Sequence, residues 1–370
     1  MRRYLEAQVQ ADLKRKMVFV GGPRQVGKST LARNILGGRA AAILNWDVDA
    51  QRALILRQSF PESPLWVFDE IHKYRKWRNY LKGVYDSRES EQQILVTGSA
   101  RLDYYRFGGD SLQGRYHYLR LHPLSAAELQ IHTAADFKSL LTLGGFPEPF
   151  LGGSLKQARR WSNEYRSRLL REDLVNLEQV QDIGSIELLM MRLPELVGSP
   201  LSVNGLAEQL QISHKTVSKW MNILERLYAV FRVLPFGSPK IKAVRKANKH
   251  YHFDWSLVPE PSHRFENLVA SHLLKWLHFR EDSEGLRTEL RYFRDIEGRE
   301  VDFVAVEDGK PVLFVECKTS DRDVSAPLRY LKQRFSEVPA WQISATGQSD
   351  YVSREGIRVA PALKLLATLV

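Results

Sequence analysis

The sequence lacks most features of secreted, membrane-spanning or fibrous proteins. Its 370 residues contain one cysteine, Cys317, so no disulfide can form within the chain, which fits a reducing compartment. No apolar run approaches the roughly 20 residues that cross a bilayer, and residues 1–16 are charged throughout, unlike a signal peptide. No internal repeat or low-complexity tract stands out. We therefore expect a cytoplasmic protein that has no membrane partner.

The length and the charge of the chain narrow the class further. A chain of 370 residues is too long for one typical compact domain, so we expect several domains. The formal net charge is +11, which suits a polyanionic partner such as nucleic acid or anionic lipid. Proteins that bind neither can carry the same charge, so a nucleic-acid partner needs support from a clustered basic surface.

A phosphate-binding loop follows the charged N-terminal segment. Residues 22–29 fit the pattern G-x-x-x-x-G-K-[ST], between a β-prone apolar run at 17–20 and a helical pattern at 29–36. Backbone amides of such a loop face phosphates, Lys28 can reach the β- and γ-phosphates, and Ser29 can bind Mg²⁺. The expected ATP-binding residues are Gly22, Pro23, Arg24, Gln25, Val26, Gly27, Lys28, Ser29 and Thr30.

An acidic pair supplies the second half of a nucleotide site. An apolar strand pattern at 65–68 ends at Asp69 and Glu70. A P-loop ATPase needs an acid on the magnesium side and an acid that activates the attacking water. Asp69 would hold Mg²⁺ through water, and Glu70 would polarise the attacking water. These residues predict ATP hydrolysis, with ATP and Mg²⁺ as cofactors and with Lys28 and Glu70 as catalytic residues.

Two further polar positions are candidates for the same reaction. A third strand pattern at 93–101 contains Thr97 and Ser99, either of which could sense the γ-phosphate from a neighbouring strand, and Ser99 is the preferred candidate. Arg115 follows a glycine and precedes an alternating apolar stretch. From there it could reach across a subunit interface and neutralise charge in the transition state. The alternative for Arg115 is an ordinary surface arginine.

The middle of the chain has the pattern of a helix-turn-helix. Residues 205–210 and 214–227 predict two helices separated by a tight turn, and an alternating strand pattern follows. The exposed face of the second helix would carry His214, Lys215, Ser218 and Lys219, which could contact DNA or pack against another domain. The basic run at 238–250, which includes Lys249, favours the DNA interpretation slightly.

The C-terminal third places acids around a strand hairpin. Glu316 and Lys318 are two residues apart on one strand and therefore share a face. A two-residue turn would direct Asp302 of the preceding strand to the other face. A three-residue loop at 308–310, or a bulge in a strand, would set Asp302 opposite Glu316, where the two Cβ atoms lie about 5 Å apart. Glu266 is expected in the first turn of a helix that begins near His263.

These four side chains suit metal-dependent cleavage of a phosphodiester. Asp302 and Glu316 could share a second Mg²⁺ or a Mn²⁺ ion, Glu266 could complete its oxygen shell, and Lys318 could stabilise developing charge. The same residues could equally form an inactive site in which Glu316 and Lys318 are an ion pair on a strand. Both interpretations require a nuclease-like fold in this part of the chain.

The motifs resemble a known family in their order along nearly the whole chain. The stretches "GGPRQVGKST", "FDEIHK", "LVTGSAR", "GRYHYLRLHPLS" and "LGGFPEP" look like the prokaryotic AAA-type (AAA+) ATPases that bear a C-terminal domain of unknown function. This resemblance implies a homo-oligomer, as a ring. The C-terminal acids and "ECK" resemble the PD-(D/E)xK nuclease superfamily.

Together the patterns predict an α/β protein with four parts. These are an AAA+ ATPase core with a parallel sheet at 1–127, a helical lid or linker at 128–185, a winged helix-turn-helix at 186–238 and a PD-(D/E)xK nuclease-like α/β domain at 239–370. We expect an ATPase that couples hydrolysis to the binding or processing of DNA, including branched or broken DNA. Two alternatives stay open: an ATP-controlled, Mg²⁺-dependent DNA nuclease, and a nucleotide switch that binds a protein partner.

Overall fold

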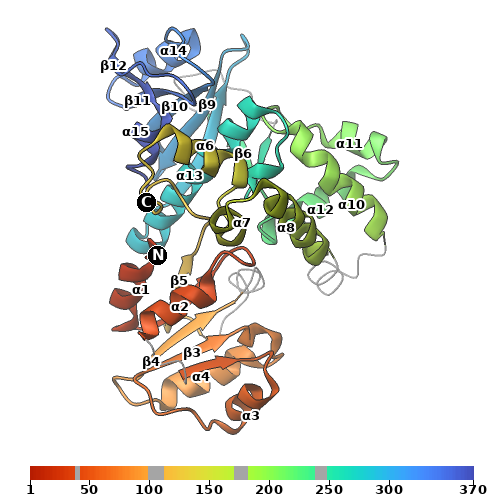
Figure 1. Cartoon of the computed structure of the whole chain (residues 1–370), viewed down its shortest axis with the longest axis vertical. Coiled ribbons are helices and arrows are strands. Elements are labelled where there is room, and N and C mark those ends of the chain that lie inside the picture. Colours follow the sequence, from red (N-terminus) through yellow and green to blue (C-terminus); the bar gives the residue numbers. More distant parts are fainter. Residues whose placement is uncertain (38–41, 99–111, 171–181, 238–247) are drawn as a thin grey trace. The chain divides into compact units, whose positions relative to one another are not determined.

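The chain contains two compact units (Figure 1). The computed structural model describes residues 1–37, 42–98, 112–170, 182–237 and 248–370. The smaller unit comprises Met1–Pro123 with Asp282–Glu284, and the larger unit comprises Leu124–Glu281 with Gly285–Val370. Within the described residues, no helix combines the length and the hydropathy needed to cross a bilayer.

The smaller unit is built on a parallel sheet of five strands in the order β2-β3-β4-β1-β5. The strands are β1 (Met17–Gly21), β2 (Ile43–Asn45), β3 (Leu65–Asp69), β4 (Gln93–Thr97) and β5 (Tyr116–Arg120). The helices are α1 (Glu6–Leu13), α2 (Lys28–Leu36), α3 (Asp49–Arg57), the short η2 (Ile71–Lys73) and α4 (Trp77–Ser87). Figure 1 shows α2 on one face of the sheet and α4 on the other.

Parallel pairing brings the carboxyl ends of these strands to one edge. In the register of the sheet, Asn45 lies beside Asp69, and Asp69 lies beside Thr97. Strands β1, β3 and β4 are almost wholly buried apolar runs, as expected when helices cover both faces of a sheet. The loop after β1 opens at the same edge as these three polar residues. One edge of the sheet therefore gathers the polar side chains of the smaller unit.

The larger unit holds a mixed sheet of eight strands in the order β12-β13-β11-β10-β9-β8-β6-β7. The strands are β6 (Val230–Pro235), β7 (Lys249–His252), β8 (Thr288–Arg294), β9 (Glu300–Glu307), β10 (Lys310–Lys318), β11 (Ala340–Ser344), β12 (Tyr351–Val352) and β13 (Ile357–Pro361). The helices are α6 (Ala134–Leu143), α7 (Pro147–Gly152), α8 (Leu155–Arg168), α10 (Ile183–Arg192), η4 (Leu193–Leu196), α11 (Val203–Gln209), α12 (His214–Arg226), η5 (Trp255–Leu257), α13 (Pro261–Glu284), α14 (Ala326–Arg334) and α15 (Ala362–Leu366).

The two helices of the expected helix-turn-helix form where the sequence predicts them. Ser213 caps α12, because its hydroxyl accepts the backbone N–H of Thr216. The strand pattern after α12 forms β6, which pairs antiparallel with β7 and parallel with β8. The β6–β7 hairpin is therefore continuous with the eight-stranded sheet. The expected boundary between residues 238 and 239 lies outside the described residues.

The stretch "LGGFPEP" has a packing role in the larger unit. Gly144 has a φ of +82°, and a Cβ atom at this position would lie 2.8 Å from Asp254 Oδ1. Phe146 is fully buried against Trp161 and Tyr165, with ring centroids 4.8 and 5.1 Å away. This motif thus holds the start of α7 against α8 and against Asp254, the residue that caps η5.

Helix α13 begins earlier than the sequence suggested. Pro261 is its first residue, and the Glu260 side chain caps it by accepting the backbone N–H of His263. Glu266 therefore lies in the second turn, and the expectation of a first-turn position was wrong. Its carboxylate is buried, so neighbouring side chains rather than the helix N-terminus determine its environment.

Candidate functional site

The phosphate-binding loop connects β1 to α2 at the polar edge of the smaller unit. Gly22 has a φ of +133°, and a Cβ atom there would lie 2.3 Å from the carbonyl oxygen of Leu121, so only glycine fits. Arg3, which the sequence analysis did not single out, donates to the carbonyl oxygens of Val26 (2.6 Å) and His122 (2.5 Å). These hydrogen bonds hold the phosphate-binding loop against the N-terminal segment.

The side chains of the loop divide into buried and exposed ones. Pro23 and Val26 are buried, Arg24 and Ser29 are partly buried, and Gln25 and Thr30 are exposed. Lys28 is buried at the start of α2. Its Nζ donates to the carbonyl oxygens of Gly22 (3.0 Å) and Pro23 (2.5 Å), so the ammonium group lies inside the curve of the loop.

Asp69 is the centre of a hydrogen-bond network at the edge of the sheet. Its Oδ2 accepts the Ser29 hydroxyl (3.0 Å) and the Asn45 amide (3.3 Å), and its Oδ1 accepts the Thr97 hydroxyl (2.5 Å). Burial raises the pKa of Asp69, and the hydrogen bonds from Thr97 and Ser29 oppose that rise. The network links three neighbouring strands to the first turn of α2.

The magnesium ion of a nucleotide complex fits this set. A serine hydroxyl and a carboxylate are oxygen ligands of the kind that Mg²⁺ prefers, and here they lie within 3.0 Å of each other. Ser29 and Asp69 would hold the ion. Thr97 and Asn45 would orient the carboxylate. From the sequence, Thr97 was only the second choice after Ser99, and Asn45 was not predicted, because its position beside Asp69 depends on the strand order.

Glu70 sits in an unusual backbone conformation next to this network. Its φ is +58°, and its backbone N–H donates to the carbonyl oxygen of Thr97 (2.9 Å). Its Oε2 lies 3.5 Å from both His72 Nε2 and Lys73 Nζ. The carboxylate is therefore at the correct edge of the sheet but is engaged by two side chains of η2.

The arginine candidate of the smaller unit, Arg115, does not lie at this edge. Arg115 precedes β5 at the opposite end of the sheet, where its carbonyl oxygen accepts the backbone N–H of Met17. Its guanidinium forms a bidentate pair with Asp86 (Nε–Oδ1 2.7 Å, second nitrogen to Oδ2 3.1 Å). A role of Arg115 in another subunit's site stays a prediction. Ser99 lies outside the described residues.

The helix-turn-helix presents a basic face. His214, Lys215 and Lys219 are exposed and Ser218 is partly exposed, whereas Val217 and other apolar residues of α12 are buried. The acidic Glu225 lies near the other end of the helix and is paired with Arg232 (3.0 Å). The first half of α12 thus exposes basic and neutral side chains.

A bulge brings the C-terminal acids onto one face. Strands β9 and β10 pair from Glu307 and Lys310, so the turn has two residues and not the three of one of the open alternatives. The register shifts between Pro311 and Leu313, as in a β-bulge, and the later pairs continue with Val315 opposite Phe303. The backbone N–H of Cys317 donates to Asp302 Oδ2 (2.8 Å). The alternative expectation of a bulge is confirmed.

A buried lysine lies at the centre of these acids. Lys249 Nζ lies 2.6 Å from Glu300 Oε1 and 3.3 Å from Glu266 Oε1, and only 1% of its side chain is exposed. The Tyr251 hydroxyl donates to the same Glu266 oxygen (2.6 Å). Lys249 was expected to belong to a basic run that favours DNA contact, and its burial shows that this expectation was wrong for this residue. We call Lys249, Glu266, Glu300, Asp302, Glu316 and Lys318 the acidic cluster.

The electrostatics of the acidic cluster follow from its burial. Burial, and then the Glu266 carboxylate, raise the pKa of Asp302 to about 7, and burial and then Asp302 raise the pKa of Glu316 to about 7. Burial lowers the pKa of Lys249, but Glu266, Asp302 and Glu300 outweigh this effect and hold it above its ordinary value. Lys249 is therefore charged, and Lys318 pairs with Glu316 Oε1 (2.7 Å).

A second metal ion does not fit the acidic cluster as it stands. In the part of the chain that the structure describes, no three His, Cys, Asp or Glu side chains are arranged to hold a metal ion. Glu266 is already engaged by Lys249 and Tyr251. One buried oxygen, Glu316 Oε2, has no hydrogen-bond partner among the described residues. The four residues expected for a nuclease thus lie together, but an ammonium group rather than a metal ion compensates Glu266.

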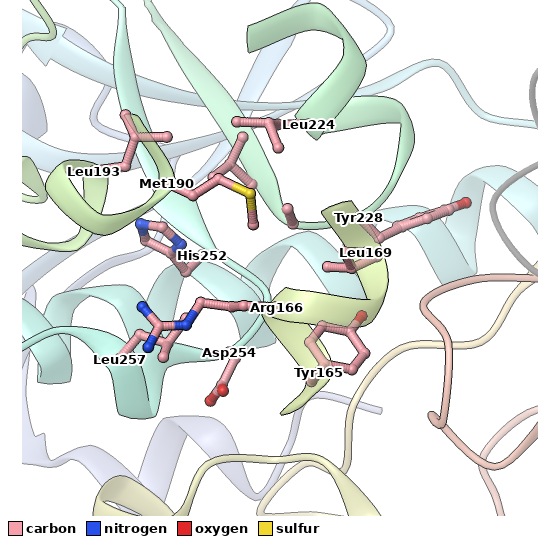
Figure 2. A pocket seen from close by; sticks show the side chains of 12 residues that line it. Tyr165, Arg166, Leu169, Met190, Leu193, Leu224, Tyr228, His252, Asp254 and Leu257 are labelled. Carbon is pink, nitrogen blue, oxygen red and sulfur yellow. The ribbon is translucent and has the colours of Figure 1, made fainter. Parts of the chain in front are cut away.

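A small cavity in the larger unit is not a candidate ligand site (Figure 2). Side chains of α8, α10 and α12 line it together with His252 and Asp254, and its volume is about 20 Å³. Such a space holds about one water molecule. Burial lowers the pKa of His252 to about 3, so the imidazole is neutral. Asp254 accepts hydroxyl hydrogen bonds from Ser162 and Ser256 (2.9 and 2.6 Å) and has a structural role.

Comparisons with known families assign three segments of the chain. Residues 14–130 match the family described as "AAA domain". Residues 134–262 match "Domain of unknown function (DUF8612)", and residues 262–365 match "Domain of unknown function (DUF4143)". The chain is 25% identical over 333 residues to "Uncharacterized protein Rv2008c" of Mycobacterium tuberculosis and to "Uncharacterized protein Mb2031c" of Mycobacterium bovis, which covers 85% of this chain and 73% of each relative.

Solved structures show only distant likenesses. A STAND protein with a tetratricopeptide repeat sensor, PH0952 from Pyrococcus horikoshii, is 14% identical with a TM-score of 0.24, and the match covers 77% of this chain and 48% of that chain. The DNA clamp loader delta protein YqeN of Bacillus subtilis is 10% identical with a TM-score of 0.25, and the match covers 60% and 88%. Bacteroides Pif1 bound to ssDNA is 13% identical with a TM-score of 0.23, and the match covers 84% and 78%.

TM-scores this low give no evidence about function. The family matches do more, because the P-loop, Asp69 and the parallel sheet all lie within the segment that matches the AAA domain. The chain therefore carries an AAA-type P-loop ATPase domain followed by two domains of unknown function, and it is homologous to the uncharacterized mycobacterial proteins.

Proposed function

We propose that the protein hydrolyses ATP in its AAA-type domain and couples turnover to the binding or processing of DNA. The hydrogen bond from Ser29 of the P-loop to Asp69 (3.0 Å) carries the first half of this proposal. It joins the phosphate-binding loop to the acid that a P-loop ATPase needs on the magnesium side.

Each residue of the site would have a distinct task. Bound ATP and Mg²⁺ supply the reactive anhydride and neutralise part of its charge. Lys28 exchanges the carbonyl oxygens of Gly22 and Pro23 for phosphate oxygens. Ser29 and Asp69 hold the metal side, and Glu70 orients the attacking water. Glu70 must loosen from His72 and Lys73 to do so, because its carboxylate is 3.5 Å from both in this state.

Phosphate release from ATP tests the first half. We expect Lys28→Ala to lose both ATP binding and turnover, and Glu70→Gln to bind ATP but turn it over at least about 100-fold more slowly. Arg33→Ala is the matched control, since Arg33 is exposed on the same helix and outside the expected ATP-binding residues. Unchanged turnover in Lys28→Ala would sink the proposed hydrolysis.

The basic face of α12 supports the second half. It exposes His214, Lys215 and Lys219 and no acid in its first two turns, on a chain with a net charge of +11. We infer that α11, α12 and the β6–β7 hairpin act as a winged helix-turn-helix, followed by a fold like that of PD-(D/E)xK nucleases. Cleavage of DNA is not part of the proposal, because a second metal ion does not fit the acidic cluster.

DNA binding is tested by fluorescence anisotropy with single-stranded, duplex and branched DNA over a range of salt concentrations. Each lost phosphate contact should reduce the slope of log K against log salt by about 0.9. We expect Lys215→Ala/Lys219→Ala to bind at least about tenfold more weakly and Lys310→Ala, an exposed lysine elsewhere in the larger unit, to bind normally. An ATPase rate that is indifferent to every DNA would favour a switch that binds a protein partner.

We also propose that the protein acts as a homo-oligomer, in which Arg115 reaches the nucleotide site of a neighbouring subunit. The exposed bidentate pair with Asp86 would have to open for this purpose. Light scattering with and without ATP measures the assembly. In mixtures with a Glu70→Gln protein, Arg115→Ala subunits should recover turnover only if the arginine acts between subunits.

A further inference from the structure

The acidic cluster of the larger unit contains an unexpected cation. A carboxylate from α13, two from β9 and one from β10 converge there, and Lys249 at the start of β7 projects among them. Lys249 and Glu266 are almost fully buried, at 1% and 8% exposure. A charged group is buried at this depth only when it is paired and hydrogen-bonded.

The contacts of Lys249 are those of a structural cation. Its Nζ reaches Glu300 Oε1 at 2.6 Å and Glu266 Oε1 at 3.3 Å, and it lies 5.3 Å from the centroid of the Tyr292 ring. Tyr251 donates to the same Glu266 oxygen at 2.6 Å. Two donors thus converge on the oxygen that would otherwise have to face a metal ion.

We propose that Lys249 is a resident cation that takes the place of a divalent metal ion in the acidic cluster, so that the cluster of the unmodified protein binds neither Mg²⁺ nor Mn²⁺. The remaining acids keep the ability to bind a metal. Asp302 and Glu316 are adjacent across β9 and β10, and Glu316 Oε2 is buried with no hydrogen-bond partner among the described residues. Removing the ammonium group leaves Glu266, Asp302 and Glu316 with too little positive charge and with space for a cation.

Binding of Mn²⁺ to the full chain tests the proposal. The protein carries Asp69→Asn and no nucleotide is added, so that the P-loop site does not bind the ion. The probe is Mn²⁺ alone, followed by electron paramagnetic resonance and by thermal unfolding. We expect the parent to show no Mn²⁺ site that depends on Asp302. We expect Lys249→Ala to bind Mn²⁺ at least about tenfold more tightly than the parent, a gain of 1.4 kcal/mol, and to lose this site again with Asp302→Asn.

The matched control is Lys275→Ala. Lys275 is equally buried in the same unit but pairs with Glu128 and Ser125, outside the acidic cluster. It should lower the unfolding temperature without creating a Mn²⁺ site. An Mn²⁺ site in the parent that Asp302→Asn or Glu316→Gln removes would overturn the proposal. So would a folded Lys249→Ala protein that gains none. If Lys249→Ala does not fold, the proposal is tested by Mn²⁺ binding to Lys249→Gln and to the parent.

Discussion

The two units use the same pair of residue types, a lysine and buried carboxylates, in opposite ways. In the smaller unit the Lys28 ammonium donates to backbone carbonyl oxygens, while hydroxyl and amide donors orient Asp69. In the larger unit the Lys249 ammonium donates to carboxylates directly. Neutral donors leave the charge of an acid available for a metal ion. A lysine on the acid compensates that charge within the fold.

The comparison shows why motif content alone does not assign a metal site. Asp69 and Glu266 are both buried acids, and burial raises the pKa of each. What differs is the partner that the fold supplies. A carboxylate that is held by neutral groups suits catalysis with a cofactor, and one that is paired with an ammonium group suits stability.

The largest effect should come from Asp69→Asn. Turnover of ATP should fall by about 1,000-fold, or roughly 4 kcal/mol, because an amide cannot hold the metal side of the nucleotide. The unfolding temperature should not fall, since the substitution removes a buried charge and keeps a hydrogen-bonding group. Phosphate release and thermal unfolding measure the two quantities. A large loss of stability would erase the distinction between the units.

The opposite outcome is expected for Glu266→Gln. The free energy of unfolding should fall by about 3 kcal/mol, because Lys249 stays buried and keeps only part of its compensating charge. Turnover of ATP should stay within twofold of the parent, since Glu266 lies outside the AAA domain. Denaturant unfolding and phosphate release provide the measurements. Exposed Glu289→Gln on β8 is the control for the loss of an acid alone.

A smaller effect should follow from Thr97→Val. The substitution keeps the shape of a fully buried side chain but removes its hydrogen bond to Asp69 Oδ1 (2.5 Å). Turnover should fall about tenfold, or roughly 1.4 kcal/mol. Thr97→Ser keeps the hydroxyl and should restore most of the rate. Equal losses in both variants would indicate a packing role for Thr97.

The smallest effect concerns the acid sensitivity of the larger unit. Burial lowers the pKa of His250 to about 4, below the ordinary 6.5, and its Nε2 contacts the carbonyl oxygen of Leu193 (2.9 Å). The unfolded state therefore takes up the proton first, and the contribution of His250 is present above pH 6.5 and is lost as the pH falls toward 4. Between pH 7 and pH 6 this loss is about 0.7 kcal/mol.

The variant His250→Gln isolates the contribution of His250 titration to stability, because glutamine can still donate to the carbonyl oxygen of Leu193 but does not titrate. The raised pKa values of Asp302 and Glu316 stabilise the fold as the pH falls, in both proteins, so they cancel in the difference between the two stability curves. We expect the parent to lose about 0.7 kcal/mol more than the variant over this interval. Parallel curves from pH 7 to pH 5 would contradict the assignment.

The gathering of Lys28, Ser29, Asp69 and Glu70 at one edge of the sheet in the smaller unit could be predicted from the sequence, because the information is local. The P-loop and the acids at the end of β3 occupy contiguous stretches, and a strand-loop-helix context is enough to orient them. Asn45 could not be predicted, since its contact with Asp69 depends on the order of strands in the sheet. Ser99 and the boundary at 238 lie outside the described residues, so these predictions stand as they were made.

The acidic cluster was harder to predict for two physical reasons. The sequence allowed the Asp302 side chain to lie on the same face of the sheet as Glu316 or on the opposite face. Only the bulge between Pro311 and Leu313 places the two on the same face. Lys249 sits in a run of basic residues that suggests a surface. One local signal was present, since Lys249 and Tyr251 are two apart and share a strand face with Phe253. The continuity of β6–β7 with the main sheet then brings that face to Glu266.

The bulge on β10 determines whether Glu316 lies on the same face of the sheet as Asp302. If the extra residue of the bulge were instead part of a regular ladder behind the same two-residue turn, the fold would keep its outline. Glu316 would then lie opposite Val301 instead of Asp302, and its carboxylate would turn to the other face of the sheet. Homologous chains that lack this bulge would share a backbone and not a charge pattern.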